Sequence, residues 1–151
     1  MTYKIKVGVL ASGGGTDLQS IIDASEKNMI DAEVKVVISD RCDAFCLKRA
    51  EKHNIQTYFI DPKNKSRTQI DSEIDRILLE KNIDLVVGAG YMRILSKDFV
   101  KKWYKNHDKW YIPFDRADII QAGIYFLEKF KQEYFTLTFP PKSFKFQSLK
   151  K

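Results

Sequence analysis

Ile5-Lys6-Val7-Gly8-Val9-Leu10-Ala11 is an apolar run of strand length, and it leads directly into the turn Ser12-Gly13-Gly14-Gly15-Thr16-Asp17. A helical pattern begins near Asp17, so a strand, a glycine-rich turn and a helix are predicted in succession. Glycine adopts positive φ without steric cost, and the first turn of a helix presents N–H groups that have no partner within it. This junction therefore predicts a binding site for an anion such as a phosphate group. A tight turn without a ligand is the alternative.

The glycine turn departs from two common nucleotide-binding motifs. A dinucleotide fingerprint requires glycine at its sixth position, but the sixth residue counted from Gly13 is Leu18. A Walker loop ends in Gly-Lys-Ser/Thr, and no lysine follows Gly15. These differences argue against NAD and against a nucleoside triphosphate as the ligand.

Strand and helix patterns alternate along the first part of the chain. Strands are predicted over residues 5–11, 34–38, 57–60 and 84–89, and helices over residues 16–27, 44–52 and 66–81. The third helix is expected to bury its apolar side chains, which are Ile70, Ile74, Ile77, Leu78 and Leu79. The alternation predicts an α/β fold, with a Rossmann-like parallel sheet and helices on both of its faces.

Parallel sheets bind ligands beyond the carboxyl ends of their strands. The glycine turn, Asp40, Asp61 and Tyr91 all follow predicted strands and are expected at that edge. Asp40 and Asp61 are interpreted as turn or cap residues without a catalytic role. His53 lies at a predicted helix terminus, where histidine interacts favourably with the helix dipole, and is interpreted as structural.

Length and composition indicate a single globular domain of 151 residues. The amino terminus lacks the long apolar core of a signal peptide, and no run approaches the length of a membrane span. We therefore expect a cytoplasmic protein that does not act at a membrane.

Charge and cysteine content argue against two further classes of partner. The net charge is +6, but lysine alternates with acidic residues along most predicted helices, which is typical of solvated faces and not of a nucleic-acid interface. Cys42 and Cys46 have no set of His or Cys partners at zinc-like spacing. We expect two reduced thiols, no metal ion and no nucleic acid.

Several segments, taken together, resemble the glycinamide ribonucleotide formyltransferases of purine biosynthesis, which use 10-formyltetrahydrofolate as co-substrate. The resemblance extends from Lys4 to about Trp103, and two segments carry most of it. They are Gly13-Gly14-Gly15-Thr16-Asp17-Leu18-Gln19 and Gly90-Tyr91-Met92-Arg93-Ile94-Leu95-Ser96. Shorter matches are Val37-Ile38-Ser39-Asp40, Asp43-Ala44-Phe45 and Lys65-Ser66-Arg67.

The resemblance implies two sets of binding residues. The phosphate of glycinamide ribonucleotide would be held by Gly14, Gly15, Thr16, Asp17 and Leu18, although the family usually has asparagine at the position of Asp17. The folate would be held by Arg67, Met92, Arg93, Ile94 and Leu95. Without the family, Arg67 would be interpreted as a solvated surface charge, and Met92, Ile94 and Leu95 as core residues after a strand.

The resemblance ends before the catalytic motif of the family. Members continue into a strand that bears Asn-x-His-Pro-Ser, and by spacing its asparagine falls on Lys109 and its histidine on Tyr111. A charged lysine and a tyrosine with an ordinary pKa cannot take over these roles at neutral pH. The remaining catalytic candidates are Asn106 and His107. They precede the expected motif positions by a few residues, and they are adjacent, whereas the family motif has one residue between its asparagine and histidine.

Residues 104–151 contain most of the aromatic residues of the chain and are interpreted as a divergent, aromatic-rich tail with helical and irregular parts after a formyltransferase-like region at residues 1–103. A helix is predicted over residues 115–134, but the strands with which the family continues its sheet are not identified. Exposed aromatic surface promotes association, so a homodimer stays open.

We therefore predict a phosphoribosylglycinamide formyltransferase that is truncated or divergent and whose activity in this polypeptide is low. A nucleotide- or phosphate-binding remnant and an interaction module are the alternatives.

Overall fold

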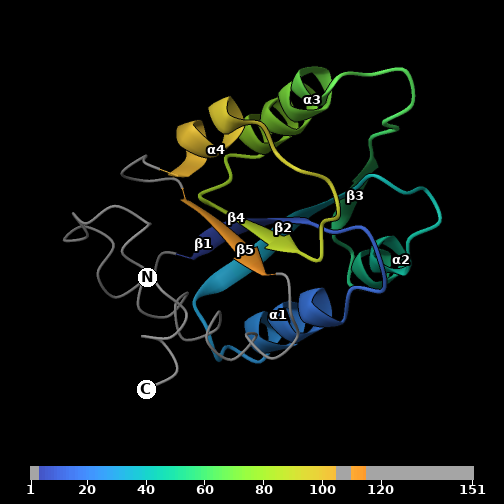
Figure 1. Cartoon of the computed structure of the whole chain (residues 1–151). Coiled ribbons are helices and arrows are strands. Elements are labelled where there is room, and N and C mark those ends of the chain that lie inside the picture. The colour runs from blue at the N-terminus through green and yellow to red at the C-terminus, as the bar shows by residue number, and fades with distance from the viewer. Residues whose placement is uncertain (1–3, 105–109, 115–151) are drawn as a thin grey trace.

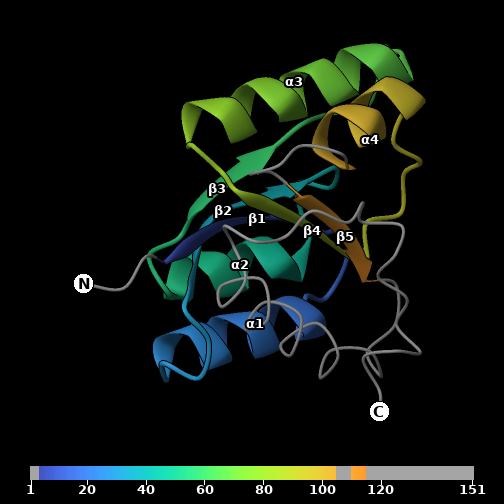
Figure 2. The same ribbon diagram turned by 90° about the vertical axis from the view of Figure 1, so that its left-hand side faces the viewer.

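The computed structural model describes residues 4–104 and 110–114, which form a parallel β-sheet between two layers of helices (Figure 1). The elements are, in chain order, β1 (Ile5–Leu10), α1 (Thr16–Glu26), β2 (Ala32–Ser39), α2 (Phe45–Lys52), β3 (Gln56–Phe59), α3 (Arg67–Glu80), β4 (Leu85–Ala89), α4 (Lys97–Tyr104) and β5 (Trp110–Phe114). Figure 2 shows α1 and α2 on one face of the sheet and α3 and α4 on the other. The predicted α/β fold with helices on both faces is confirmed, and each element predicted between residues 5 and 89 is found within two residues of its expected bounds.

The order of the strands places the crevice of the sheet between β1 and β4. The strands lie in the order β3-β2-β1-β4-β5, and every neighbouring pair is parallel. The chain first moves outward from β1 through β2 to β3, and then returns to the other side of β1 with β4. Loops that follow β1 and β4 therefore diverge to opposite faces, which is the arrangement that creates a ligand site in open parallel sheets.

The centre of the sheet is buried on both faces, which explains the near-continuous apolar run of β1. Val7 and Val9 pack in the core under α1 and α2, whereas Leu10 packs in the core under α3 and α4. Gly8 lets α3 approach closely, because a Cβ at this position would lie 2.7 Å from Leu78 Cδ2.

The predicted burial of α3 is confirmed except at Leu79. Leu78 is fully buried, but Leu79 is 41% exposed, because consecutive residues of a helix point about 100° apart. The polar residue Asp71 is buried instead, at 5% exposure. The predicted helix start is explained by a capping box, in which Ser66 Oγ accepts from Gln69 N and Gln69 Oε1 accepts from Ser66 N.

The strand β5 departs from the prediction, which identified no strand directly after Trp103. Trp110–Phe114 pairs in parallel with β4, and Pro113 is opposite Gly88. Proline has no N–H to donate and is tolerated in edge strands, and β5 is the edge strand next to β4 in the described sheet. The proposed boundary at residue 103 stays a prediction, and the helix predicted over residues 115–134 lies outside the described residues.

Two adjacent leucines of α3 test this description of the core. We expect Leu78→Ala to lower the free energy of unfolding by about 2–5 kcal/mol, because it removes a fully buried side chain and leaves a cavity. Leu79→Ala makes the same chemical change one residue later and should cost less than about 1 kcal/mol. Urea denaturation of both variants measures the difference. Equal losses would contradict the assigned orientation of α3.

Candidate functional site

The glycine turn connects β1 to α1. At Gly15 its backbone has a conformation that only glycine adopts readily. Gly15 is the N-cap residue of α1, with φ of 79° in the left-handed region. A Cβ on Gly15 would lie 2.8 Å from Cys46 Cβ and 2.9 Å from Cys46 Cα. By contrast, a Cβ on Gly13 or Gly14 would meet no atom within 4 Å, so this part of the turn is open to an approaching ligand.

The first turn of α1 directly follows the three glycines. Gly15 provides no side-chain cap, so the helix begins without the side-chain acceptor that often covers its first N–H groups. Thr16 is exposed, and Asp17 is half-buried in the first turn. The side chain of Leu18 is fully buried in the core, so only its backbone could contact a ligand. This geometry suits an anion, with the Thr16 hydroxyl as an additional donor.

The hydroxyl of Ser12 connects the ends of three strands. Ser12 follows β1 and is 3% exposed. Its Oγ donates to Asp40 Oδ1 beyond β2 over 2.6 Å, and accepts from Met92 N beyond β4 over 2.8 Å. In addition, Ser12 N donates to Gly90 O over 3.2 Å. The segment after β4 is thereby fixed next to the glycine turn.

A buried carboxylate holds the other end of the segment after β4. Asp71 Oδ2 on α3 accepts from Ser96 N over 2.6 Å. Ser96 in turn accepts from Phe99 N, at 3.2 Å, where α4 begins. Residues 92–96 are therefore attached at both ends, to Ser12 and to Asp71, while the residues between these contacts remain exposed or half-buried.

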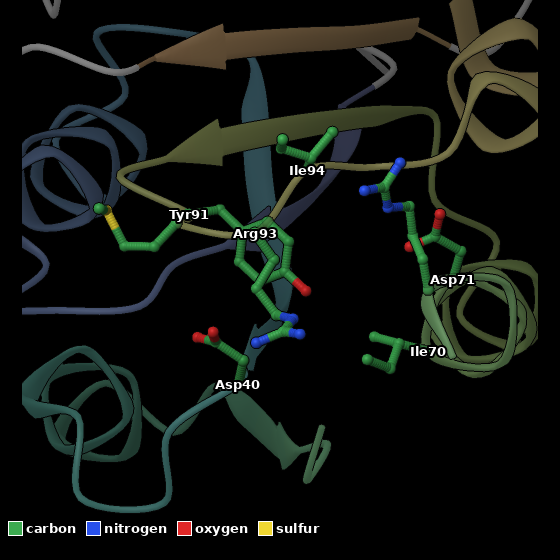
Figure 3. A pocket seen from close by; sticks show the side chains of 8 residues that line it. Asp40, Ile70, Asp71, Tyr91, Arg93 and Ile94 are labelled. Carbon is green, nitrogen blue, oxygen red and sulfur yellow. The ribbon is translucent and has the colours of Figure 1, made fainter. Parts of the chain in front are cut away.

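A cavity of about 340 Å³ lies between this segment and α3. Figure 3 shows residues of the β4–α4 segment facing Ile70 and Asp71 of α3, with Asp40 at the cavity as well. The lining residues are Asp40, Arg67, Ile70, Asp71, Tyr91, Met92, Arg93 and Ile94. The cavity thus combines apolar side chains with two arginines and two carboxylates.

Four of the five predicted folate-binding residues line this cavity: Arg67, Met92, Arg93 and Ile94. Met92 and Ile94 are 79% and 71% exposed, so the alternative that they are core residues is wrong. Leu95 is not among the lining residues, because its half-buried side chain packs against the core under α3 and α4.

The contacts of Ser12 and Asp71 were not predicted from the sequence, and Asp40 was predicted at this edge of the sheet only as a turn or cap residue. Their contacts are made across long distances in the sequence, and a serine after a strand or an aspartate within a helix gives no local signal of such a contact.

The other predicted polar residues have structural contacts. Asp61 Oδ1 accepts from Lys63 N over 3.0 Å, which confirms its interpretation as a turn residue. His53 is the C-cap of α2, and its Nδ1 lies 2.7 Å from Glu26 Oε2, which fits a structural role. Cys42 and Cys46 are both free thiols, and burial raises the pKa of the Cys46 thiol, so Cys46 stays protonated at neutral pH.

The catalytic candidates Asn106 and His107 lie outside the described residues, as does Lys109. Tyr111, at the position of the family histidine, is on β5 opposite Val86. Among residues 4–104 and 110–114, no helix is long and apolar enough to cross a membrane, and no cluster of His, Cys, Asp or Glu could hold a metal ion.

The glycine turn and the cavity lie in a part of the chain that is similar to known proteins. Residues 5–107 match the family model described as formyl transferase. This range includes β1, the glycine turn and the cavity segment, which is residues 92–96. The chain belongs to the formyl transferase family. Phosphoribosylglycinamide formyltransferase of Dictyostelium discoideum is 41% identical over 115 residues, which cover 70% of this chain and 55% of the relative. A trifunctional purine biosynthetic protein of Gallus gallus is 46% identical over 103 residues, which cover 68% of this chain and 10% of the relative.

Solved structures of the formyl transferase family show the same fold. Glycinamide ribonucleotide transformylase 1 from Symbiobacterium toebii has a TM-score of 0.63 at 40% identity, with 65% of this chain and 47% of that chain covered. Phosphoribosylglycinamide formyltransferase from Coxiella burnetii, in complex with CHES, has a TM-score of 0.65 at 39% identity, with 68% and 48% covered. This family member therefore spans about half the length of these two structures.

Two glycines of the turn test its geometry. We expect Gly15→Ala to lower the free energy of unfolding by about 2 kcal/mol or more, because alanine is strained at positive φ and its Cβ would collide with Cys46. Gly13→Ala adds the same methyl group into open space and should change stability by less than about 0.5 kcal/mol. Thermal and urea denaturation give both values. A harmless Gly15→Ala would refute the left-handed conformation at this residue.

Proposed function

We propose that this chain provides the substrate-binding half of a phosphoribosylglycinamide formyltransferase. It would hold glycinamide ribonucleotide by its phosphate at the glycine turn and 10-formyltetrahydrofolate in the cavity beside α3. The observation that carries this proposal is the Ser12 bridge, which joins the two candidate sites directly through the 2.8 Å bond from Met92 N. Two substrates bound at these places would have their reacting groups close together, as direct group transfer requires.

The phosphate would be bound mainly by backbone groups. The N–H groups of Gly14, Gly15, Thr16, Asp17 and Leu18 surround the start of α1, where the helix dipole favours a negative charge. The Thr16 hydroxyl would add one donor. The Asp17 carboxylate must point away from the phosphate, because like charges repel at short range.

The folate would occupy the cavity lined by Arg67, Met92, Arg93 and Ile94. The exposed side chains of Met92 and Ile94 give apolar contact area for a flat pterin ring, and backbone groups of residues 92–95 would hydrogen-bond to its edge. The guanidinium groups of Arg67 and Arg93 suit the carboxylates of a folate tail. Leu95 would act through its backbone and by supporting the segment from the core.

The reaction is a direct acyl transfer. The amine of glycinamide ribonucleotide attacks the formyl carbon, a tetrahedral oxyanion forms, and its collapse releases tetrahydrofolate. Positioning of the two substrates can account for a large part of such a rate enhancement. Donors for the oxyanion and a group that accepts the amine proton are also needed, and Asn106 and His107 are the candidates.

We expect weak catalysis because the family asparagine and histidine correspond to Lys109 and Tyr111. The loss of the asparagine and the histidine favours a second candidate function. In that case the chain binds the ribonucleotide but does not catalyse formyl transfer. For either function we infer a cytoplasmic location and small-molecule partners, with no nucleic acid, membrane or metal ion involved. A homodimer is the assembly considered for this chain, and its molar mass in solution can be measured by light scattering.

Ligand-induced stabilisation and turnover, measured on the full chain, separate these functions. At a concentration of 100 times its dissociation constant, glycinamide ribonucleotide should stabilise the fold by about 2.7 kcal/mol. The riboside that lacks the phosphate is the matched control and should give little stabilisation. Formyl transfer from 10-formyltetrahydrofolate should be slower than about 1 s⁻¹, the low end of typical turnover.

Three results would change the conclusion. Equal stabilisation by the riboside would contradict phosphate binding at the turn. No response to the ribonucleotide would favour an interaction module. Turnover at an ordinary rate would show that Asn106, His107 or another group of the tail performs the chemistry, and that the predicted low activity is wrong.

A further inference from the structure

Arg49 extends from α2 to the glycine turn, although no motif or binding prediction includes it. Its Nε donates to Gly14 O over 2.6 Å, and its Nη1 donates to Gln19 Oε1 on α1 over 3.2 Å. We propose that Arg49 is a positioning residue that sets the direction of the phosphate-binding N–H groups. This inference rests on the proposed binding of the ribonucleotide phosphate at the turn.

The direction follows from the planarity of the peptide unit. In a trans peptide the C=O and the following N–H point in opposite directions, and the described residues contain no cis peptide bond. Gly14 O is held by Arg49, so the N–H of Gly15 points away from α2. Gly13 O is held by Cys46 N over 3.0 Å, so the N–H of Gly14 also points away from α2. Both amides are thereby directed to the open side of the turn.

A turn of three successive glycines needs such a restraint more than other turns do. Glycine has access to more backbone conformations than any other residue, so an unrestrained Gly13-Gly14-Gly15 segment would populate several peptide orientations. Each binding event would then carry the entropic cost of selecting one orientation. A carbonyl held by a guanidinium group is a charge-assisted hydrogen bond, which is stronger than a neutral one.

Arg49 is itself held in place by its neighbours. Its guanidinium carbon lies 4.8 Å from the centroid of the Phe45 ring, within the range of a cation–π contact. Its acceptor Gln19 is held in turn by Asp23, to which Gln19 Nε2 donates over 2.9 Å, and by His53, whose Nε2 lies 3.2 Å away. The planar fork of arginine reaches Gly14 and Gln19 together, which the single ammonium of lysine reproduces only in part.

Three variants separate positioning from simple attraction between charges. Arg49→Met removes the charge and both hydrogen bonds, Arg49→Lys keeps the charge, and Lys48→Met removes one charge from an exposed site next to Arg49 on the same helix. The dissociation constant of glycinamide ribonucleotide is measured by calorimetry on the full chain. We expect Arg49→Met to weaken binding by about tenfold or more, because the ligand must then order the backbone of at least one glycine that Arg49 no longer holds.

The other two variants and a folate analogue serve as controls. Arg49→Lys should recover part of the affinity, and Lys48→Met should change it by less than about twofold, since exposed charges contribute little. Binding of a folate analogue should be unchanged in all three variants. Equal weakening by Arg49→Met and Lys48→Met would indicate attraction between charges, and an unchanged affinity in Arg49→Met would also overturn the proposal.

A measurement without ligand keeps this inference separate from the proposed function. In ¹H–¹⁵N spectra of the free protein, Gly14 and Gly15 should each give one sharp amide signal, and Arg49→Met should broaden or multiply these signals. If the wild-type chain does not bind the ribonucleotide, the proposed function fails while this test still decides the role of Arg49. Unchanged glycine signals in Arg49→Met would overturn that role.

Discussion

The Ser12 hydroxyl donates one hydrogen bond and accepts another, and the candidate site depends on this pair of contacts. A buried hydroxyl that lacks a partner is costly, so the two bonds to Asp40 and Met92 fix the side chain as well as the segments it joins. The contacts lie at the carboxyl ends of β1, β2 and β4. The loops after β1 and β4 lead to opposite faces of the sheet. The Ser12 contacts hold these two loops together and thereby fix the distance between the glycine turn and the cavity.

Loops of the candidate site are held by helices on both faces of the sheet. On the α1 and α2 side, backbone carbonyls of the glycine turn are held from α2, and Gly15 is packed against Cys46. On the α3 and α4 side, Asp71 holds Ser96 N at the end of the cavity segment. Both sides thus use contacts between a loop and a helix that lies far from it in the sequence, so a ligand meets groups that are already oriented.

Local sequence patterns predicted the elements well and the contacts poorly. The alternation of apolar strands and amphipathic helices gave the parallel sheet, and the three glycines indicated the turn, because both signals are contained in short segments. The strand β5 was missed because Pro113 lies within the segment, and a proline inside an apolar run argues against a paired strand. The bridge at Ser12, the buried Asp71 and the reach of Arg49 depend on the tertiary fold, and no local pattern encodes them. Resemblance to a family predicted binding roles for Arg67, Met92, Arg93 and Ile94, and all four residues line the cavity.

Under the proposed function, the glycine turn and the cavity beside α3 are the two parts of one substrate-binding half of a formyltransferase. The most direct test is a crystal structure of the full chain with glycinamide ribonucleotide and a folate analogue bound together. We predict the phosphate within hydrogen-bonding distance of Gly14 N and Gly15 N, and the pterin ring against Met92 and Ile94. A phosphate bound elsewhere, or a folate outside the cavity beside α3, would contradict the account.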